Sequence, residues 1–344
     1  MSVLSVAIIR RSAKWWLGIL LSIICLALVL RGVVLADVLA ALARTNYGLM
    51  ALAVVTVVLT GMAKTARWQL LFYPNQARLR FEGLFGALMI GQMVNLAVPA
   101  RLGDLVRAYT VGATEGVSKS LALGTIVVEK LFDMLMTLLC LIFLFLLIYL
   151  PSWVWDLGFS LAISTGSVLV VALAMTYQRD RILRGVAALL RLLPPLAARQ
   201  LYLQIESALK GLEVLGHVQA NLGIWGWSLL IWALAVATNY IVFLAMRMAL
   251  PLVAALFLLI VLQVGGAVPS SPGKVGVFQY LCVLALSLFS MERSVTLGCS
   301  LVLYLVVFLP PLLLGVFFSS RSPVAFHALK SEDPVVVLSG EDAC

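Results

Sequence analysis

Long apolar runs recur along almost the whole chain, and they constrain its fold more than any other feature. A helix needs about 20 mostly apolar residues to cross the hydrocarbon core of a bilayer. Residues 17–36, 124–150, 157–177 and 222–246 meet this requirement, residues 47–63 are just long enough, and residues 295–318 are interrupted by two prolines. A cleaved signal peptide explains a single run of this kind but not a series of them. We predict an all-α, polytopic membrane helix bundle that forms one integral membrane domain, residues 1–344.

The charged residues lead to the same prediction. They make up 11% of the chain, whereas soluble domains carry roughly 25%. The net charge of +9 could suggest a nucleic-acid partner, but the lysines and arginines cluster at the ends of the apolar runs. The tendency of positively charged loops to stay in the cytoplasm explains this arrangement. We therefore expect no nucleic-acid partner, and we expect a multi-pass protein of the plasma (inner) membrane with both termini in the cytoplasm.

Polar segments divide the chain into two apolar halves. We place the halves at residues 15–177 and 222–318, with an amphipathic linker at residues 178–221 and a short tail at residues 319–344, both in the cytoplasm. In the linker, leucines such as Leu189 alternate with Arg184 and Arg191, a pattern typical of a helix that lies on the membrane surface. Connecting the two halves is its simplest role, and sensing of anionic lipids is an alternative.

Two shorter apolar stretches end at a proline within hydrophobic surroundings. Residues 83–99 and 252–269 share the pattern V-P-x-x-x-G at their ends. Backbone that is not helical survives at membrane depth only inside protein or beside a water-filled cavity. With the topology above, the first stretch enters from the cytoplasm and the second from outside, which predicts two broken or re-entrant helices in an inverted-topology repeat. Secondary transporters hold substrates between such repeats. The structural residues at the breaks are Pro99, Gly103, Pro269, Pro272, Gly273 and Gly276.

The densest polar cluster surrounds the first break and the start of the longest apolar run. Its candidate substrate-binding residues are Asn95, Arg101, Asp104, Arg107, Glu129, Lys130 and Asp133. Helical spacing places Asp104 within pairing reach of Arg101 and Arg107. Two interpretations remain open. The charges are either structural pairs at the inner ends of the spans, or Arg101 and Arg107 hold an anionic group such as a lipid phosphate while the acidic residues balance them.

The second polar cluster follows the other break. Its candidate substrate-binding residues are Ser270, Ser271, Lys274 and Gln279. The prolines and glycines of this segment forbid a continuous helix and leave backbone groups available for binding. Lys274 is the natural contact for an anion. A nucleotide-binding loop is not expected, because the order G-x-x-x-x-G-K-[ST] is absent and no strand precedes it.

Other residue types indicate packing more than chemistry. We interpret Arg67-Trp68 as an anchor of the second span at the interface, and Gly61, Gly86 and Gly91 as sites of close helix packing. His217 and His327 lack cysteines or carboxylates at ligand spacing, so we expect no metal. No Ser/His/Asp or Cys/His set is available for nucleophilic catalysis, and no bound cofactor is implied. An enzyme is therefore not the favoured interpretation.

Four motifs together resemble one known family. They are A-R-W at residues 66–68, N-x-x-x-P-x-R-x-G-D-x-x-R at 95–107, V-E-K-L-F-D at 128–133 and V-P-x-S-P-G-x-x-G at 268–276. They are similar, in the same order, to motifs of the flippase-like, lysylphosphatidylglycerol-synthase transmembrane domain proteins of bacteria and archaea. The chain departs from the family pattern at Lys274 and Gln279, where P-G-G-x-G-x-x-E is frequent.

The resemblance implies a membrane domain that moves lipids. In the multi-domain proteins of that family, such a domain moves the aminoacylated lipid between leaflets and a soluble synthase domain follows it. Because only residues 319–344 follow the last apolar run here, we do not expect aminoacyl transfer by this chain alone. Single-domain relatives are linked to glycolipid or polyprenyl-linked sugar metabolism.

We therefore expect a flippase-like transporter of an anionic or aminoacylated phospholipid, or of a polyprenyl-linked lipid. The expected partners are membrane lipids with an anionic headgroup and a separate lipid-modifying enzyme. The alternatives are a membrane-embedded glycosyl- or aminoacyl-transferase component, with Asp104 and Glu129 as its acid/base pair, and a scaffold for a separate lipid synthase that itself transports nothing.

Overall fold

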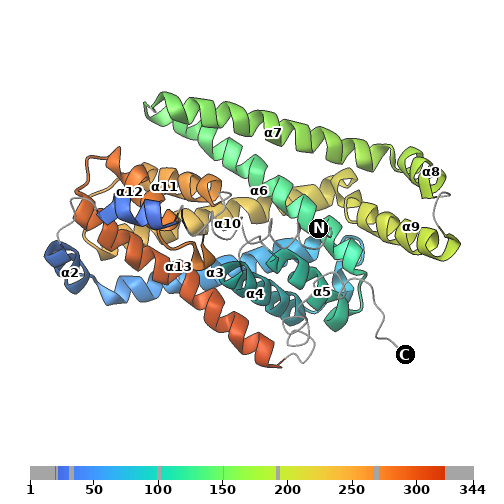
Figure 1. Cartoon of the computed structure of the whole chain (residues 1–344), viewed down its shortest axis with the longest axis horizontal. Coiled ribbons are helices and arrows are strands. Elements are labelled where there is room, and N and C mark those ends of the chain that lie inside the picture. Colours follow the sequence, from blue (N-terminus) through green and yellow to red (C-terminus); the bar gives the residue numbers. More distant parts are fainter. Residues whose placement is uncertain are drawn as a thin grey trace, which may run out of the picture.

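The computed structural model describes residues 20, 22–30, 35–98, 102–149, 151–190, 194–266 and 271–321. Within these ranges every regular element is a helix and no strand occurs. Five helices are long and apolar enough to cross a membrane, namely α3 (Tyr47–Leu70), α6 (Lys119–Leu147), α7 (Ser152–Tyr177), α10 (Val218–Ala245) and α13 (Arg293–Arg321) (Figure 1). The prediction of an all-α, multi-pass membrane bundle is confirmed.

The helix bounds differ from the predicted spans at several ends. Helix α3 continues to Leu70 rather than ending near residue 63, because its polar last turns are buried in the protein. Helix α7 begins earlier than predicted, at Ser152. The predicted first span, residues 17–36, lies only partly within the described residues, of which 22–30 are helical. Helix α2 (Leu35–Ala43) already begins within the last two residues of the predicted span, and it packs against α13.

The predicted linker is largely helical. It forms α8 (Arg179–Leu190), α9 (Pro195–Lys210) and the short 3-10 helix η2 (Glu213–Gly216). Arg179 forms ion pairs with Glu206 of α9 and with Glu213 of η2, which ties α8 to both of these helices. Helix α9 also packs against α6. The helix predicted around Arg184 is therefore confirmed, and its placement on a membrane surface remains a prediction.

The first break separates the two helices of a hairpin. Helix α4 (Phe81–Ala97) ends at Val98, whose extended backbone (ψ 125°) is expected because the residue before a proline disfavours the helical region. Helix α5 (Gly103–Glu115) returns and packs against α4. A Cβ atom at Gly103 would collide with the carbonyl oxygen of Gly91, so glycine allows the two backbones to touch. The side chain of Asn95 accepts a hydrogen bond from Gly103 N at 2.8 Å.

The second break also separates the two helices of a hairpin. Helix α11 (Leu252–Gly265) is followed by the turn η3 (Pro272–Lys274) and by α12 (Val277–Ser287), which packs back against α11. Gly276 has a φ of 86°, and its amide donates a hydrogen bond of 2.7 Å to the buried side chain of Gln279. The hydroxyl of Tyr304 donates a hydrogen bond of 2.6 Å to the carbonyl of Gly273. Both apolar stretches thus end near their prolines, as predicted, although Pro99 and Pro269 lie outside the described residues.

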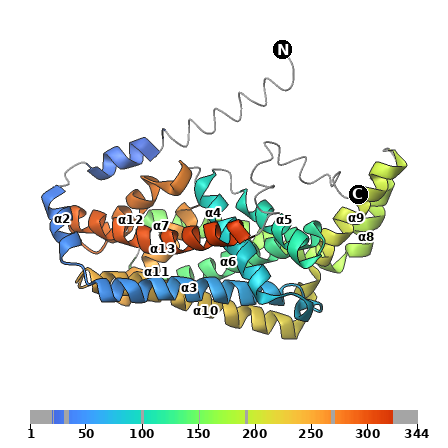
Figure 2. The same ribbon diagram turned by 90° about the horizontal axis from the view of Figure 1, so that it is seen from below.

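The long helices bring the two hairpins together. Helices α3 and α10 lie side by side, and α13 packs against α4, α12 and α3 (Figures 1 and 2). Helix α4 also contacts η3, so the break of the second hairpin lies against a helix of the first. Gly61 and Gly86 lie at close helix contacts, since a Cβ atom would meet Met89 or Phe318 at 2.9 Å. This confirms the packing role predicted for these glycines.

Candidate functional site

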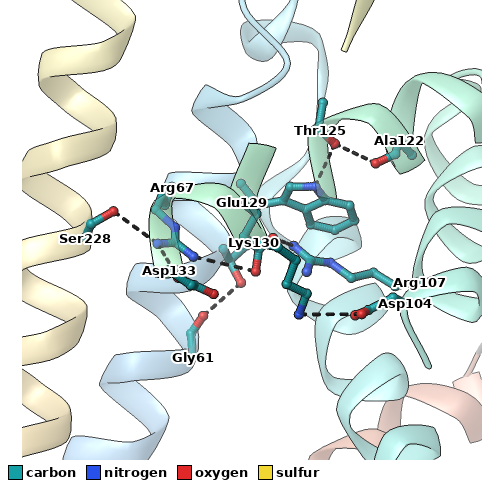
Figure 3. Close-up of polar contacts among 12 residues, drawn as sticks. Gly61, Arg67, Asp104, Arg107, Ala122, Thr125, Glu129, Lys130, Asp133 and Ser228 are labelled. Carbon is teal, nitrogen blue, oxygen red and sulfur yellow. Dashed lines mark hydrogen bonds and ion pairs between the residues drawn. The ribbon is translucent and has the colours of Figure 1, made fainter. Parts of the chain in front are cut away.

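A network of buried charges joins three helices. Arg67 of α3 lies 2.8 Å from Asp133 and 3.6 Å from Glu129, which are one turn apart on α6. Arg107 of α5 lies 2.7 Å from Glu129. Arg67 also donates a hydrogen bond of 3.0 Å to Ser228 of α10 (Figure 3). One carboxylate, Glu129, therefore holds two arginines from different helices.

The burial of these side chains makes the network costly to disturb. Arg67 is 0%, Arg107 2% and Glu129 4% exposed. A buried ion that loses its partner destabilises a protein by roughly 3–5 kcal/mol, because it keeps its desolvation penalty. The network is not saturated, since Nε of Arg67 and Nε of Arg107 have no hydrogen-bond partner among the described residues. The two arginines therefore depend on the carboxylates of α6.

The interpretation of Arg67-Trp68 as an interfacial anchor is wrong. Both residues are fully buried. The indole nitrogen of Trp68 donates a hydrogen bond of 3.0 Å to Thr125, and the guanidinium of Arg107 lies 3.5 Å above the Trp68 ring. The sequence contains a signal for this, because no glycine or proline after Gly61 interrupts the helical pattern before Pro74. A continuing helix carries Arg67 into the bundle.

The pairing predicted within the first cluster is only partly correct. Glu129 and Asp133 share a helix face, as predicted, and both contact Arg67. No ion pair joins Asp104 to Arg107 in the described part of the chain; Asp104 pairs with Lys130 at 3.5 Å instead. Neighbours on one helix compete with partners on other helices, and here α6 supplies the partners, Lys130 for Asp104 and Glu129 for Arg107. Arg101 lies outside the described residues.

A cavity lies beside this network, between the two hairpins and the long helices. Its volume is about 260 Å³. Helices α3, α6 and α10 contribute polar side chains, and so do both hairpins; these side chains include Lys64, Gln92, Asp133, Asn239, Gln263 and Lys274. The remaining wall is mostly apolar, with Trp232, Phe278, Phe308 and the two prolines of α13, Pro310 and Pro311. The cavity is thus amphipathic and lies within the bundle.

The charge of the cavity is positive. Among the described residues that line it, the charged ones are Lys64, Lys274 and Asp133. Asp133 is already compensated by Arg67 at 2.8 Å. In surroundings of low dielectric constant, charge is stabilised only by a partner of opposite sign. With two lysines and one carboxylate among its described lining residues, the cavity carries a net positive charge, and an anionic group would balance it.

The predicted site residues fall into three positions. Asp133 and Lys274 line the cavity, whereas Arg107 and Glu129 form the network behind it. Lys130 of α6 pairs with Asp104 of the first hairpin. The remaining described candidates belong to the hairpins themselves, namely Asn95, Gly103, Asp104, Ser271, Pro272, Gly273, Gly276 and Gln279. Arg101 and Ser270 lie outside the described residues, as do Pro99 and Pro269.

Four side chains of the cavity that carry an ammonium or amide group were not predicted from the sequence. They are Lys64, Gln92, Asn239 and Gln263. For Lys64 a signal exists, because it lies three residues before Arg67 and so on the same face of the helix. The other three are single amides inside apolar helices, where local sequence gives no indication of the surface that they face. Their common cavity is visible only in the assembled bundle.

Comparisons with known proteins give two matches. A family model described as "Lysylphosphatidylglycerol synthase TM region" matches residues 15–315. Glycosyltransferase AglD of Haloferax volcanii is 32% identical over 118 residues, which make up 34% of this chain and 19% of that protein. The matched part is thus about a fifth of the relative's length. No solved structure matches the chain.

Proposed function

The chain belongs to the family of lysylphosphatidylglycerol synthase TM regions, and from this premise we propose that it moves a lipid with an anionic headgroup between the two leaflets. The observation that carries the proposal is the amphipathic cavity with Lys64 and Lys274 in its wall. A lipid likewise combines a charged part with an apolar part, since its phosphate is charged and its chains are apolar. The motifs at Arg67, Arg107 and Glu129 agree with the family assignment.

The charges of the cavity favour phosphate over a cationic headgroup. An aminoacylated headgroup carries an added positive charge, and the one described carboxylate in the wall, Asp133, is occupied by Arg67. A phosphate accepts charge-assisted hydrogen bonds from lysine ammonium groups. Phosphatidylglycerol or a polyprenyl phosphate therefore fits the wall better than lysyl-phosphatidylglycerol.

The two hairpins support transport over simple binding. Gln92 of the first hairpin and Lys274 of the second line the same cavity. Many transporters place broken helices from two inverted repeats around a central site and open it alternately to each side. We assign α4–α5 and α11–α12 to such repeats, in a protein of the plasma membrane with cytoplasmic termini.

A second candidate function follows from the relative in Haloferax volcanii, which is named a glycosyltransferase. In this alternative the chain presents a polyprenyl-linked lipid to a separate lipid-modifying enzyme. Catalysis by the chain itself is less well supported. Glu129 is held by Arg67 and Arg107, and Asp104 by Lys130, so neither residue of the expected acid/base pair faces the cavity.

Purified protein in liposomes tests the proposal directly. Fluorescent phosphatidylglycerol, lysyl-phosphatidylglycerol and a polyprenyl phosphate are placed in the inner leaflet, and their arrival in the outer leaflet is followed with a membrane-impermeant quencher. Lys64→Ala and Lys274→Ala should each slow the movement of the anionic lipid by roughly 10- to 100-fold, the loss expected for one charge-assisted hydrogen bond.

Two controls separate the cavity from general charge effects. Arg181→Ala removes an exposed positive charge on α8 and should leave the rate unchanged. Lys64→Arg keeps the charge and should retain much of the activity. If folded wild-type protein moves none of the three lipids, the transport proposal is wrong and presentation of a lipid to another enzyme becomes the better account.

A further inference from the structure

A second hollow lies on the bundle between α6, α10 and α11. It is an open groove with a volume of about 770 Å³. Its wall is almost wholly apolar, and no charged side chain is present among the described residues that line it. The residues that define it include Leu139, Phe143, Ala233, Ala237, Tyr240 and Leu256. We refer to it as the apolar groove.

We propose that the apolar groove holds a hydrocarbon chain of the same lipid whose headgroup lies in the cavity. This inference rests on the proposed function, because it assigns the position of the lipid's tail in that site. The occupant is thus an acyl or polyprenyl chain that enters from the bilayer, and it is attached to a phosphate that Lys64 and Lys274 contact.

The groove and the cavity are adjacent on all three helices. Trp232 of α10 lines both hollows, and its side chain is buried between them. On α6, Asp133 faces the cavity and Met136, about one turn later, faces the groove. On α11, Leu259 faces the cavity and Leu256 faces the groove. The boundary between the two hollows therefore falls within one turn on each of these three helices. The Trp232 indole separates the two hollows at this boundary.

The volumes of the two hollows also fit the two parts of a lipid, with the headgroup in the cavity and the chains in the groove. Pockets that enclose a whole small ligand measure roughly 300–1,000 Å³. The cavity, at about 260 Å³, is slightly smaller and suits a headgroup alone. The groove, at about 770 Å³, is larger and offers only apolar contacts. A charged headgroup in the cavity therefore needs a path for its chains, and the groove begins where the cavity ends.

The hollow exists because α10 presents small side chains at this position. Ala233 and Ala237 are one turn apart, and both line the groove. Larger side chains on α6 and α11 rise on either side of them, among them Phe143 and Leu256. A phenylalanine at residue 237 would therefore fill the groove without entering the cavity. Ala51 on α3 is exposed and does not line the groove, so Ala51→Phe is the matched control.

Photo-crosslinking tests the inference without requiring transport. Full-length protein is reconstituted with phosphatidylglycerol that carries a diazirine on one acyl chain, and the labelled peptides are identified by mass spectrometry. Labelling of α6 and α11 at the groove should fall about tenfold in Ala237→Phe, as expected when several CH₂ contacts are lost. It should remain at the wild-type level in Ala51→Phe. Ala233→Phe serves as a second blocking variant if Ala237→Phe does not fold.

A substitution in the cavity that holds the headgroup distinguishes labelling by a bound lipid from labelling by the surrounding bilayer. Lys274→Ala should also reduce labelling in the groove, because the phosphate would no longer anchor the chain. Unchanged labelling in folded Ala237→Phe and Ala233→Phe, or in Lys274→Ala, would overturn the inference while leaving the transport assay to decide the function. Labelling that depends on Lys274 in a protein that moves no lipid would support the groove and refute transport.

Discussion

Replacing Glu129 with glutamine removes a carboxylate that contacts two buried arginines. Arg107 lies 2.7 Å from Glu129 and is 2% exposed, so it loses its ion pair and remains desolvated. Arg67, at 3.6 Å, retains Asp133 and Ser228. The cost should therefore arise mainly at Arg107, whose guanidinium would still lie against the face of the Trp68 ring but would have lost its carboxylate.

The expected loss is about 3–5 kcal/mol, the cost of leaving a buried charge without its partner. An unfolding entropy of about 2.1 cal/mol/K per residue amounts to about 0.7 kcal/mol/K for a chain of 344 residues. A change of 1 kcal/mol then shifts the midpoint of thermal unfolding by roughly 1.4 °C, so Glu129→Gln should lower the apparent Tm by roughly 4–7 °C. The measurement is a thermal unfolding scan in detergent micelles at one fixed scan rate, because membrane proteins commonly unfold irreversibly.

Two further variants make this prediction specific. Asp104→Asn breaks a pair whose side chains are 24% and 47% exposed, so it should cost at most about 1 kcal/mol. Arg107→Met together with Glu129→Gln should recover part of the loss, since both ends of the buried pair are then uncharged. If Glu129→Gln unfolds within about 1 °C of wild type, less than one kcal/mol at the same conversion, the structural role of the network is refuted.

Two other substitutions test the hairpins by the same thermal scan. Gly103→Ala should lower stability by about 1–3 kcal/mol, because the new Cβ atom collides with the Gly91 carbonyl and forces α4 and α5 apart; a wild-type midpoint would contradict this contact. Tyr304→Phe should cost about 0.5–1.5 kcal/mol through loss of the 2.6 Å hydrogen bond to Gly273, and it should raise the protease sensitivity of the second hairpin, whereas unchanged cleavage would argue against an anchoring role.

The family and the membrane architecture could be predicted from the sequence because both depend on local patterns. Apolar runs of bilayer length mark spanning helices wherever they occur, and α6, α7, α10 and α13 lie where these runs predicted them. A proline likewise acts on its own neighbourhood, so the ends of α4 and α11 were predictable. The position of Lys274 within a break also marked it as a candidate anion contact, and it lines the cavity.

The choice of partners among the charged residues could not be predicted in this way. Helical spacing suggested that Asp104 pairs within its own helix, but its observed partner is Lys130 on α6. Arg67 was assigned to the interface because its span was expected to end near residue 63. Its burial depends on α6 and α10 supplying Asp133 and Ser228, which are distant in sequence.

The sequence by itself determined that the chain is a helical membrane protein of its family, with two proline-broken helices and a set of charges near them. Only the tertiary structure decided which charges meet one another and which face a cavity. The physical reason is that hydrophobicity and backbone preference act over a few residues, whereas a buried charge is stabilised by partners from other helices. The packing of α3, α6, α10 and the two hairpins therefore places Lys64, Asp133 and Lys274 in one wall.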